Sequence, residues 1–76
     1  MKNITLDKLP LNTEATVTNL LAKHNLRRRL LDLGLVDGTT IKPILLSPSG
    51  DPRAYEFRGS LISIRKEDAK LIEIKK

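Results

Sequence analysis

The sequence contains no cysteine, which excludes both disulfide bonds and thiolate metal sites. No apolar run approaches the roughly 20 residues that a membrane-spanning helix needs. Residues 1–7 lack the apolar stretch of a secretion signal. We therefore expect a cytoplasmic protein. We also expect residues 1–76 to form a single domain, because a chain of this length is too short for two.

The charge balance is basic. Fourteen lysines and arginines stand against nine acidic residues, giving a formal net charge of +5. This charge favours acidic partners, which include nucleic acid, phosphate-bearing ligands, anionic membrane surfaces and acidic protein faces. A small domain also needs some net charge to stay soluble, so the charge alone does not select a partner.

One stretch has the spacing of a helix. Its leucines fall on a single stripe, at Leu26, Leu30 and Leu33. We predict that Asn25 caps the start of this helix and that Gly34 ends it in a left-handed conformation. Leu35 then folds back onto Leu30 in a Schellman motif. A helix of about nine residues is marginal alone, so its leucine stripe must pack on the rest of the chain.

Three consecutive arginines, Arg27, Arg28 and Arg29, lie within the same stretch. They cannot all face a core, so we predict that they cover the solvent side of the helix. Arg28 and Asp32 are four residues apart and are expected to form a weak ion pair.

Five short segments have the alternation and β-branched content of strands, at residues 14–20, 39–46, 54–58, 60–64 and 71–74. Residues 5–10 and 65–69 are predicted to form single helical turns, the first capped by Thr5. The pattern predicts a mainly β fold, a small, partly closed barrel of about five strands with one α-helix inserted after the first strand. Closure suits so short a chain because it removes exposed sheet edges.

Alternation in the strands, with Leu6 and Leu9 of the N-terminal turn, predicts which side chains face the core. These are Leu6, Leu9, Ala15, Val17, Ile41, Leu45, Tyr55, Phe57, Ile62, Ile64, Ile72 and Ile74. Ile44 and Leu46 fall on the opposite face of the second strand. Pro43 lacks a backbone N–H, so it indicates an edge position or a bulge.

Five blocks, in this order and spacing, carry a family resemblance: residues 29–35, 38–39, 50–52, 55–59 and 64–69. They resemble the FeoA family, the small cytosolic partners of the bacterial ferrous iron transporter FeoB. The match runs from about Leu6 to Ile74. It departs from the family pattern at Val36–Asp37, where a proline usually precedes the glycine, at Asn12, where glycine is common, and at Pro43.

The resemblance implies an SH3-like β-barrel with a helix between its first two strands. It also implies a non-enzymatic accessory protein of ferrous iron uptake, which contacts the cytosolic GTPase region of FeoB and reaches the membrane only through that transporter. Two alternatives stay open, a GTPase-activating protein for FeoB and a basic nucleic-acid-binding or repressor-associated module. Similar domains are fused to metal-dependent repressors, and a fold does not determine function.

We predict that Arg27, Arg28, Ile44 and Leu46 form the partner interface. Arginine is enriched at interfaces, and exposed apolar residues mark them. The alternatives are a merely solvated helix face, and a strand face covered by the helix or by the N-terminal turn. For the GTPase-activating hypothesis, one of the three arginines would enter the partner's phosphate site.

No metal or cofactor site is predicted. His24 is the single histidine and has no paired acids nearby in the sequence. Asp51 is explained by a local Asx hydrogen bond in its turn, and Glu67–Asp68 suit the first turn of a short helix. A metal site needs several converging ligands, which the sequence does not offer.

Catalysis and nucleic-acid binding are not expected either. The chain has no nucleophile–histidine–carboxylate set and no phosphate-binding loop. Tyr55 and Phe57 are its only aromatic residues, and a half-buried strand turns both inward. Single-stranded nucleic acid is bound on exposed aromatic side chains, so we expect no nucleic-acid partner.

Overall fold

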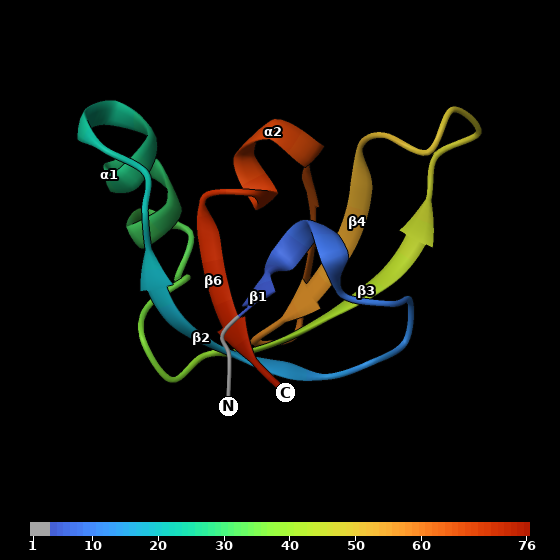
Figure 1. Cartoon of the computed structure of the whole chain (residues 1–76), viewed down its shortest axis with the longest axis horizontal. Coiled ribbons are helices and arrows are strands. Elements are labelled where there is room, and N and C mark those ends of the chain that lie inside the picture. Colours follow the sequence, from blue (N-terminus) through green and yellow to red (C-terminus); the bar gives the residue numbers. More distant parts are fainter. Residues whose placement is uncertain (1–3) are drawn as a thin grey trace.

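The computed structural model describes residues 4–76 and shows a bent antiparallel sheet with two short helices (Figure 1). In chain order the elements are β1 (Ile4–Thr5), the 3₁₀ turn η1 (Leu6–Lys8), β2 (Ala15–Leu20), α1 (His24–Asp32), β3 (Thr40–Leu46), β4 (Arg53–Phe57), β5 (Ser60–Ile64), α2 (Lys66–Ala69) and β6 (Ile72–Lys75). Neither helix is long and apolar enough to cross a membrane, within the part of the chain described.

The six strands follow the order β1-β6-β2-β3-β4-β5, and all neighbours are antiparallel. The sheet curls around its core into the predicted partly closed barrel (Figure 1). The sheet has six strands, where about five were predicted, and the additional strand is β1. β1 is only two residues long and exists through pairing with the other end of the chain, Ile4 opposite Ile74, so α1 follows the second strand.

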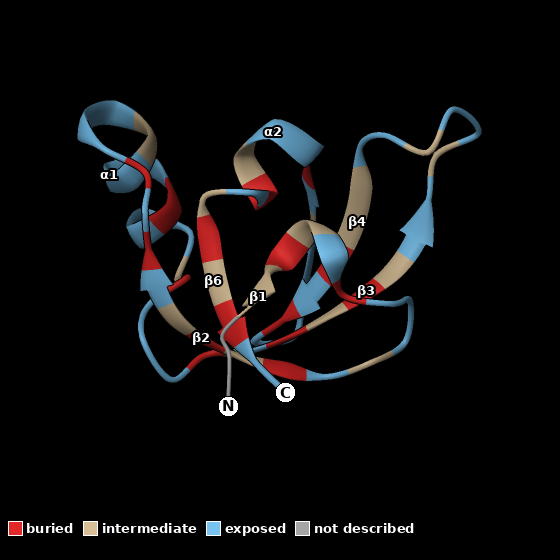
Figure 2. Ribbon diagram, in the orientation of Figure 1, coloured by how far each residue is buried: buried red, intermediate tan, exposed pale blue. Residues whose placement is uncertain are grey.

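The core lies on the concave side of the sheet, where the strands carry their buried residues (Figure 2). Most predicted core residues are buried, namely Leu6, Leu9, Ala15, Val17, Ile41, Tyr55, Phe57, Ile64, Ile72 and Ile74. Ile62 is half-buried against them. Leu30, Leu35 and Ala69 join the same cluster, so both helices pack on the sheet.

Leu45 contradicts the prediction, because 58% of it is exposed. A β-bulge in β3 is the cause. Pro43 lies opposite Tyr55 but Leu45 lies opposite Ala54, so Ile44 is an extra residue on this strand. The bulge reverses the alternation after Pro43 and turns Leu45 outward. Pro43 indicated an edge position or a bulge, and the bulge is confirmed. β3 lies between β2 and β4, but its pairing with β2 stops at Ile41, two residues before Pro43.

Helix α1 ends as predicted. The N–H of Leu35 donates to the carbonyl of Leu30 and that of Gly34 to Leu31, both at 3.0 Å, and Gly34 has φ of 101°. These are the two bonds of a Schellman motif. The predicted start is wrong, because the cap position is Lys23, with no side-chain cap bond. Leu33, the C-cap residue, is 40% exposed, so the last position of the predicted leucine stripe does not pack into the core.

Arg53 connects the two ends of the open sheet. It lies in β4 beside β5, and its guanidinium donates to the carbonyls of Leu6, Asp7 and Leu9, around η1, at 2.9, 3.1 and 2.7 Å. Its Nε also donates to the Tyr55 hydroxyl at 3.0 Å. Burial raises the pKa of Tyr55 above its ordinary value, although the positive charge of Arg53 acts in the opposite direction.

Candidate docking surfaces

The outward side of α1 combines positive charge with apolar surface. A shallow groove along it is lined by His24, Asn25, Arg27, Arg28 and Leu31. We call Arg27, Arg28 and Leu31 the helix patch; all three are exposed. Figure 1 shows α1 extending from the body of the sheet. The sequence predicted the arginines but not Leu31, which was hidden inside a leucine-rich run.

The three arginines are all exposed, as predicted, but their contacts differ. Arg27 donates from Nη1 to the carbonyl of Leu20 at 3.1 Å. Arg29 approaches Asp68 at 3.9 Å. Arg28 has no hydrogen bond or ion pair within residues 4–76, and the predicted pair with Asp32 is not formed. Arg28 is therefore the arginine whose full charge is available to a partner.

The C-terminal end of β3 carries two exposed leucines, Leu45 and Leu46, which we call the strand patch; they are 58% and 48% exposed. As neighbours along a strand they point to opposite faces of the sheet, Leu45 outward and Leu46 toward a hollow that Arg53 and Tyr55 also line. Of the predicted interface residues, Leu46 is thus at the surface, whereas Ile44 is half-buried. This end of β3 lies on the opposite side of the molecule from α1 (Figure 1). The structure therefore separates the two halves of the predicted interface.

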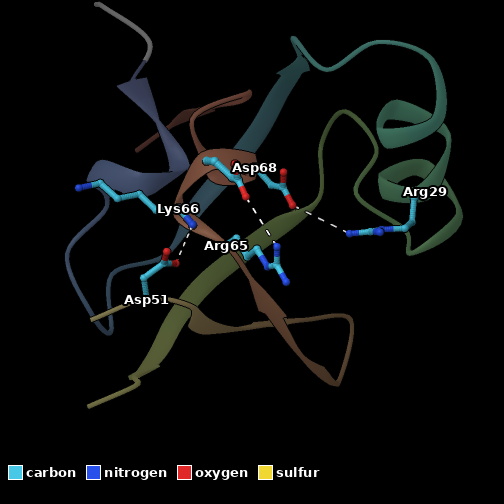
Figure 3. Close-up of polar contacts among 6 residues, drawn as sticks. Arg29, Asp51, Arg65, Lys66 and Asp68 are labelled. Carbon is cyan, nitrogen blue, oxygen red and sulfur yellow. Dashed lines mark hydrogen bonds and ion pairs between the residues drawn. The ribbon is translucent and has the colours of Figure 1, made fainter. Parts of the chain in front are cut away.

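The acidic residues considered as metal ligands have structural partners instead. The Asp51 carboxylate accepts the backbone N–H of Lys66 at 2.8 Å, so it caps α2 across the fold rather than its own turn (Figure 3). Glu67 and Asp68 occupy the first turn of α2, as predicted. Among the residues described, no three histidine or acidic side chains come together as a metal site would require.

Both aromatic side chains point into the core, as predicted. Tyr55 and Phe57 are 1% and 2% exposed. Neither offers a surface on which a nucleic-acid base can stack. The basic charge of the chain is thus not accompanied by the aromatic platform typical of single-strand binding.

Comparison with known proteins identifies the family. A model of the FeoA domain matches residues 4–76. The chain belongs to the FeoA family. It is a small, non-catalytic accessory domain of ferrous iron transport, which confirms the prediction that it is not an enzyme.

Three relatives show how far the similarity to FeoA proteins extends. The FeoA protein of Chlorobium tepidum is 36% identical, with a TM-score of 0.88 over 95% of this chain and 69% of that one. Stenotrophomonas maltophilia FeoA, a zinc complex described as a procaryotic SH3 domain protein, is 29% identical, with a TM-score of 0.85 over 95% and 89%. The SH3-like fold that the resemblance implied is therefore confirmed.

A third relative joins two proteins in one chain. It is the fusion of Fe(2+) transport protein A with the Fe(2+) transporter FeoB in Porphyromonas gingivalis, 32% identical over 69 residues. The match covers 91% of this chain but only 8% of the fusion protein. In that organism an FeoA domain and FeoB are parts of the same polypeptide.

Proposed function

We propose that this FeoA domain works in the cytoplasm by binding the cytosolic GTPase region of an FeoB-type ferrous iron transporter. The observation that carries the proposal is the relative in which an FeoA domain and FeoB share one chain. Covalent linkage raises the effective concentration of one domain near the other, which is of use when the two make contact. Such a contact depends on the surface of the FeoA domain itself.

The helix patch is the surface best suited to that contact. Arg28 has no intramolecular partner among the residues described, so binding a carboxylate breaks no existing pair. Leu31 lies in the same groove and adds apolar area that becomes buried on contact. Arginine beside apolar surface is typical of residues that dominate binding energy. The complementary surface on the partner is acidic with an apolar centre.

The strand patch is a separate candidate contact. Leu45 and Leu46 are uncharged and exposed, but they lie far from α1 (Figure 1). A flat partner surface covers one patch or the other, whereas a partner that wraps around the domain contacts both. The two patches therefore make different predictions: docking on the helix patch shifts amides in α1, and docking on the strand patch shifts amides at the end of β3.

The test is a titration of the ¹⁵N-labelled chain with the soluble cytosolic region of FeoB. We expect amide shifts in α1 and a Kd that rises about tenfold in Arg28→Glu, since reversing a charge at an interface costs more than deleting it. Lys75→Glu is the matched control: it makes the same charge change on β6, outside both patches. Absence of shifts in both α1 and the end of β3 refutes the proposed contact.

A second candidate function is activation of the transporter's GTP hydrolysis, favoured by the unpaired guanidinium of Arg28. A guanidinium inserted at the phosphates stabilises charge in the transition state and increases the rate by about 10³-fold or more. We expect the rate enhancement to disappear in Arg28→Ala while binding weakens only modestly. An unchanged hydrolysis rate on mixing the two proteins eliminates this role and leaves simple docking.

A further inference from the structure

Strand β5 has an unpaired edge. It is the last strand of the sheet order, paired with β4 on one side only. Arg58 and Gly59, with φ of 53° and 77°, form a two-residue turn between the two strands. The residues flanking such a turn form a hydrogen-bonded pair, and bonded and non-bonded pairs then alternate. The N–H and C=O groups of Leu61 and Ser63 therefore point away from β4.

These edge groups are accessible. Within residues 4–76 neither Leu61 nor Ser63 makes a backbone or side-chain hydrogen bond outside the β4–β5 pairing. Both are exposed, Leu61 by 57%. Proteins usually protect an edge with lysine, proline or a bulge, but residues 60–64, Ser-Leu-Ile-Ser-Ile, contain no charge and no proline. The edge thus has the properties of a template for an added strand.

A groove lined by two weakly paired arginines lies beside this edge. It runs between α1 and α2 and is lined by Leu26, Arg29, Pro52, Ser63, Arg65, Glu67 and Asp68. Arg29 lies 3.9 Å from Asp68, and Arg65 lies 3.8 Å from Glu67. Both distances exceed hydrogen-bond length, and the two arginine side chains are 71% and 73% exposed. Figure 3 shows the Arg29 and Arg65 guanidinium groups, each with one dashed contact. A guanidinium carries five N–H donors, so donors remain for an incoming carboxylate.

A second copy of the chain is a poor occupant of the edge. Antiparallel pairing of two β5 strands about Ile62 brings the turn residue Arg58 of one copy toward Lys66, in α2, of the other, beyond both ends of the paired strands. Like charges brought together repel. Each copy also has a net charge of +5, which adds repulsion. The charges around β5 therefore favour a different protein with acidic side chains.

We propose that β5 accepts an extended segment of another protein as an added strand, with an Asp or Glu side chain of that segment placed between Arg29 and Arg65. Backbone bonds to Leu61 and Ser63 supply affinity, and the two arginines supply selectivity. This proposal does not depend on the helix patch, which lies on the other side of α1. It adds a site for a flexible acidic segment to the rigid contact proposed above.

The probe is a synthetic peptide of alternating valine and threonine with one central glutamate, compared with the same peptide carrying glutamine. We expect the glutamate peptide to slow amide exchange of Leu61 and Ser63 and to shift Arg29 and Arg65 Nε signals. The glutamine peptide is expected to bind about tenfold more weakly, because hydrogen bonds to a charged group are the stronger ones. Equal binding of the two peptides refutes the role of the arginines.

Variants of the chain separate the two parts of the site. Ser63→Pro removes an N–H that faces the free edge, and we expect it to weaken binding of the peptide at least fivefold. Thermal unfolding of the variant checks that the fold is intact. Arg65→Gln is compared with Lys75→Gln on β6, and only Arg65→Gln is expected to weaken the glutamate peptide. The proposal is overturned if Arg65→Gln matches its control, or if exchange at Leu61 slows with protein concentration alone, which indicates a second copy.

Discussion

Replacing Arg53 with methionine tests how the two ends of the barrel are joined. Methionine keeps the apolar stem but removes three hydrogen bonds to the carbonyls of Leu6, Asp7 and Leu9 and one to Tyr55. A bond to a charged group contributes about 1.5–3 kcal/mol, but these bonds share one partly exposed guanidinium and are not additive. We take about 3 kcal/mol for the set, out of a total of roughly 4–11 kcal/mol for a domain of this size.

The assay is urea unfolding at neutral pH, supported by thermal melts. A loss of about 3 kcal/mol corresponds to a Tm lower by at least about 12 °C in so small a domain. The unfolding free energy of Arg53→Lys should fall between those of the wild type and Arg53→Met, since one ammonium group cannot reach all four acceptors. Arg28→Met is the control, because Arg28 is exposed and unpaired among the residues described. If Arg53→Met is within 1 kcal/mol of that control, at the level of an ordinary surface substitution, the reasoning fails.

Three further predictions concern the core and α1. Leu30→Ala should cost about 2–4 kcal/mol in urea unfolding because Leu30 is buried between helix and sheet; a loss below 1 kcal/mol contradicts that packing. Gly34→Ala should cost about 1–2 kcal/mol because φ is 101° there, with Cβ 3.3 Å from the Arg58 side chain; an unchanged midpoint refutes the strain. Burial raises the folded-state pKa of Tyr55 above its unfolded value of 10.0, so its contribution is complete below pH 10 and is lost as pH rises through the folded pKa. Urea midpoints should therefore fall more steeply above pH 10 in the wild type than in Tyr55→Phe, and parallel curves contradict this.

The features that the sequence predicts well are those determined by neighbouring residues. The Schellman end of α1 depends only on Gly34 and on the leucines on either side of it. The inward positions of Tyr55 and Phe57 follow from simple alternation in a regular strand. The missing N–H of Pro43 indicated an irregularity in β3, and a bulge, one of its two alternatives, lies directly after it. In each case the physical cause lies within a few residues of its effect.

The features that were missed depend on distant parts of the chain. β1 is too short to show alternation and is defined by its pairing with β6. Arg53 looks like an ordinary charge after a loop, and only folding brings it to the carbonyls around η1. Leu45 was assigned to the core because regular alternation was assumed along the whole strand. The bulge after Pro43 shifts that alternation, and its position depends on the pairing with β4.

The candidate site divides in the same way. Helical spacing is enough to place Arg27, Arg28 and Arg29 on the outside. It cannot tell which of them is already engaged, because the partners of Arg27 and Arg29 are Leu20 and Asp68. Nor does it show that α1 and the end of β3 lie on opposite sides, since that separation is set by the curl of the sheet (Figure 1).

The most direct test of the proposed docking is the affinity of the cytosolic region of FeoB for Arg28→Glu and for Lys75→Glu, measured side by side at low and at physiological salt. If Arg28 contacts an acidic surface, Arg28→Glu binds about tenfold more weakly than Lys75→Glu, and the difference shrinks as salt increases. Equal affinities of the two variants at both salt concentrations contradict docking through α1.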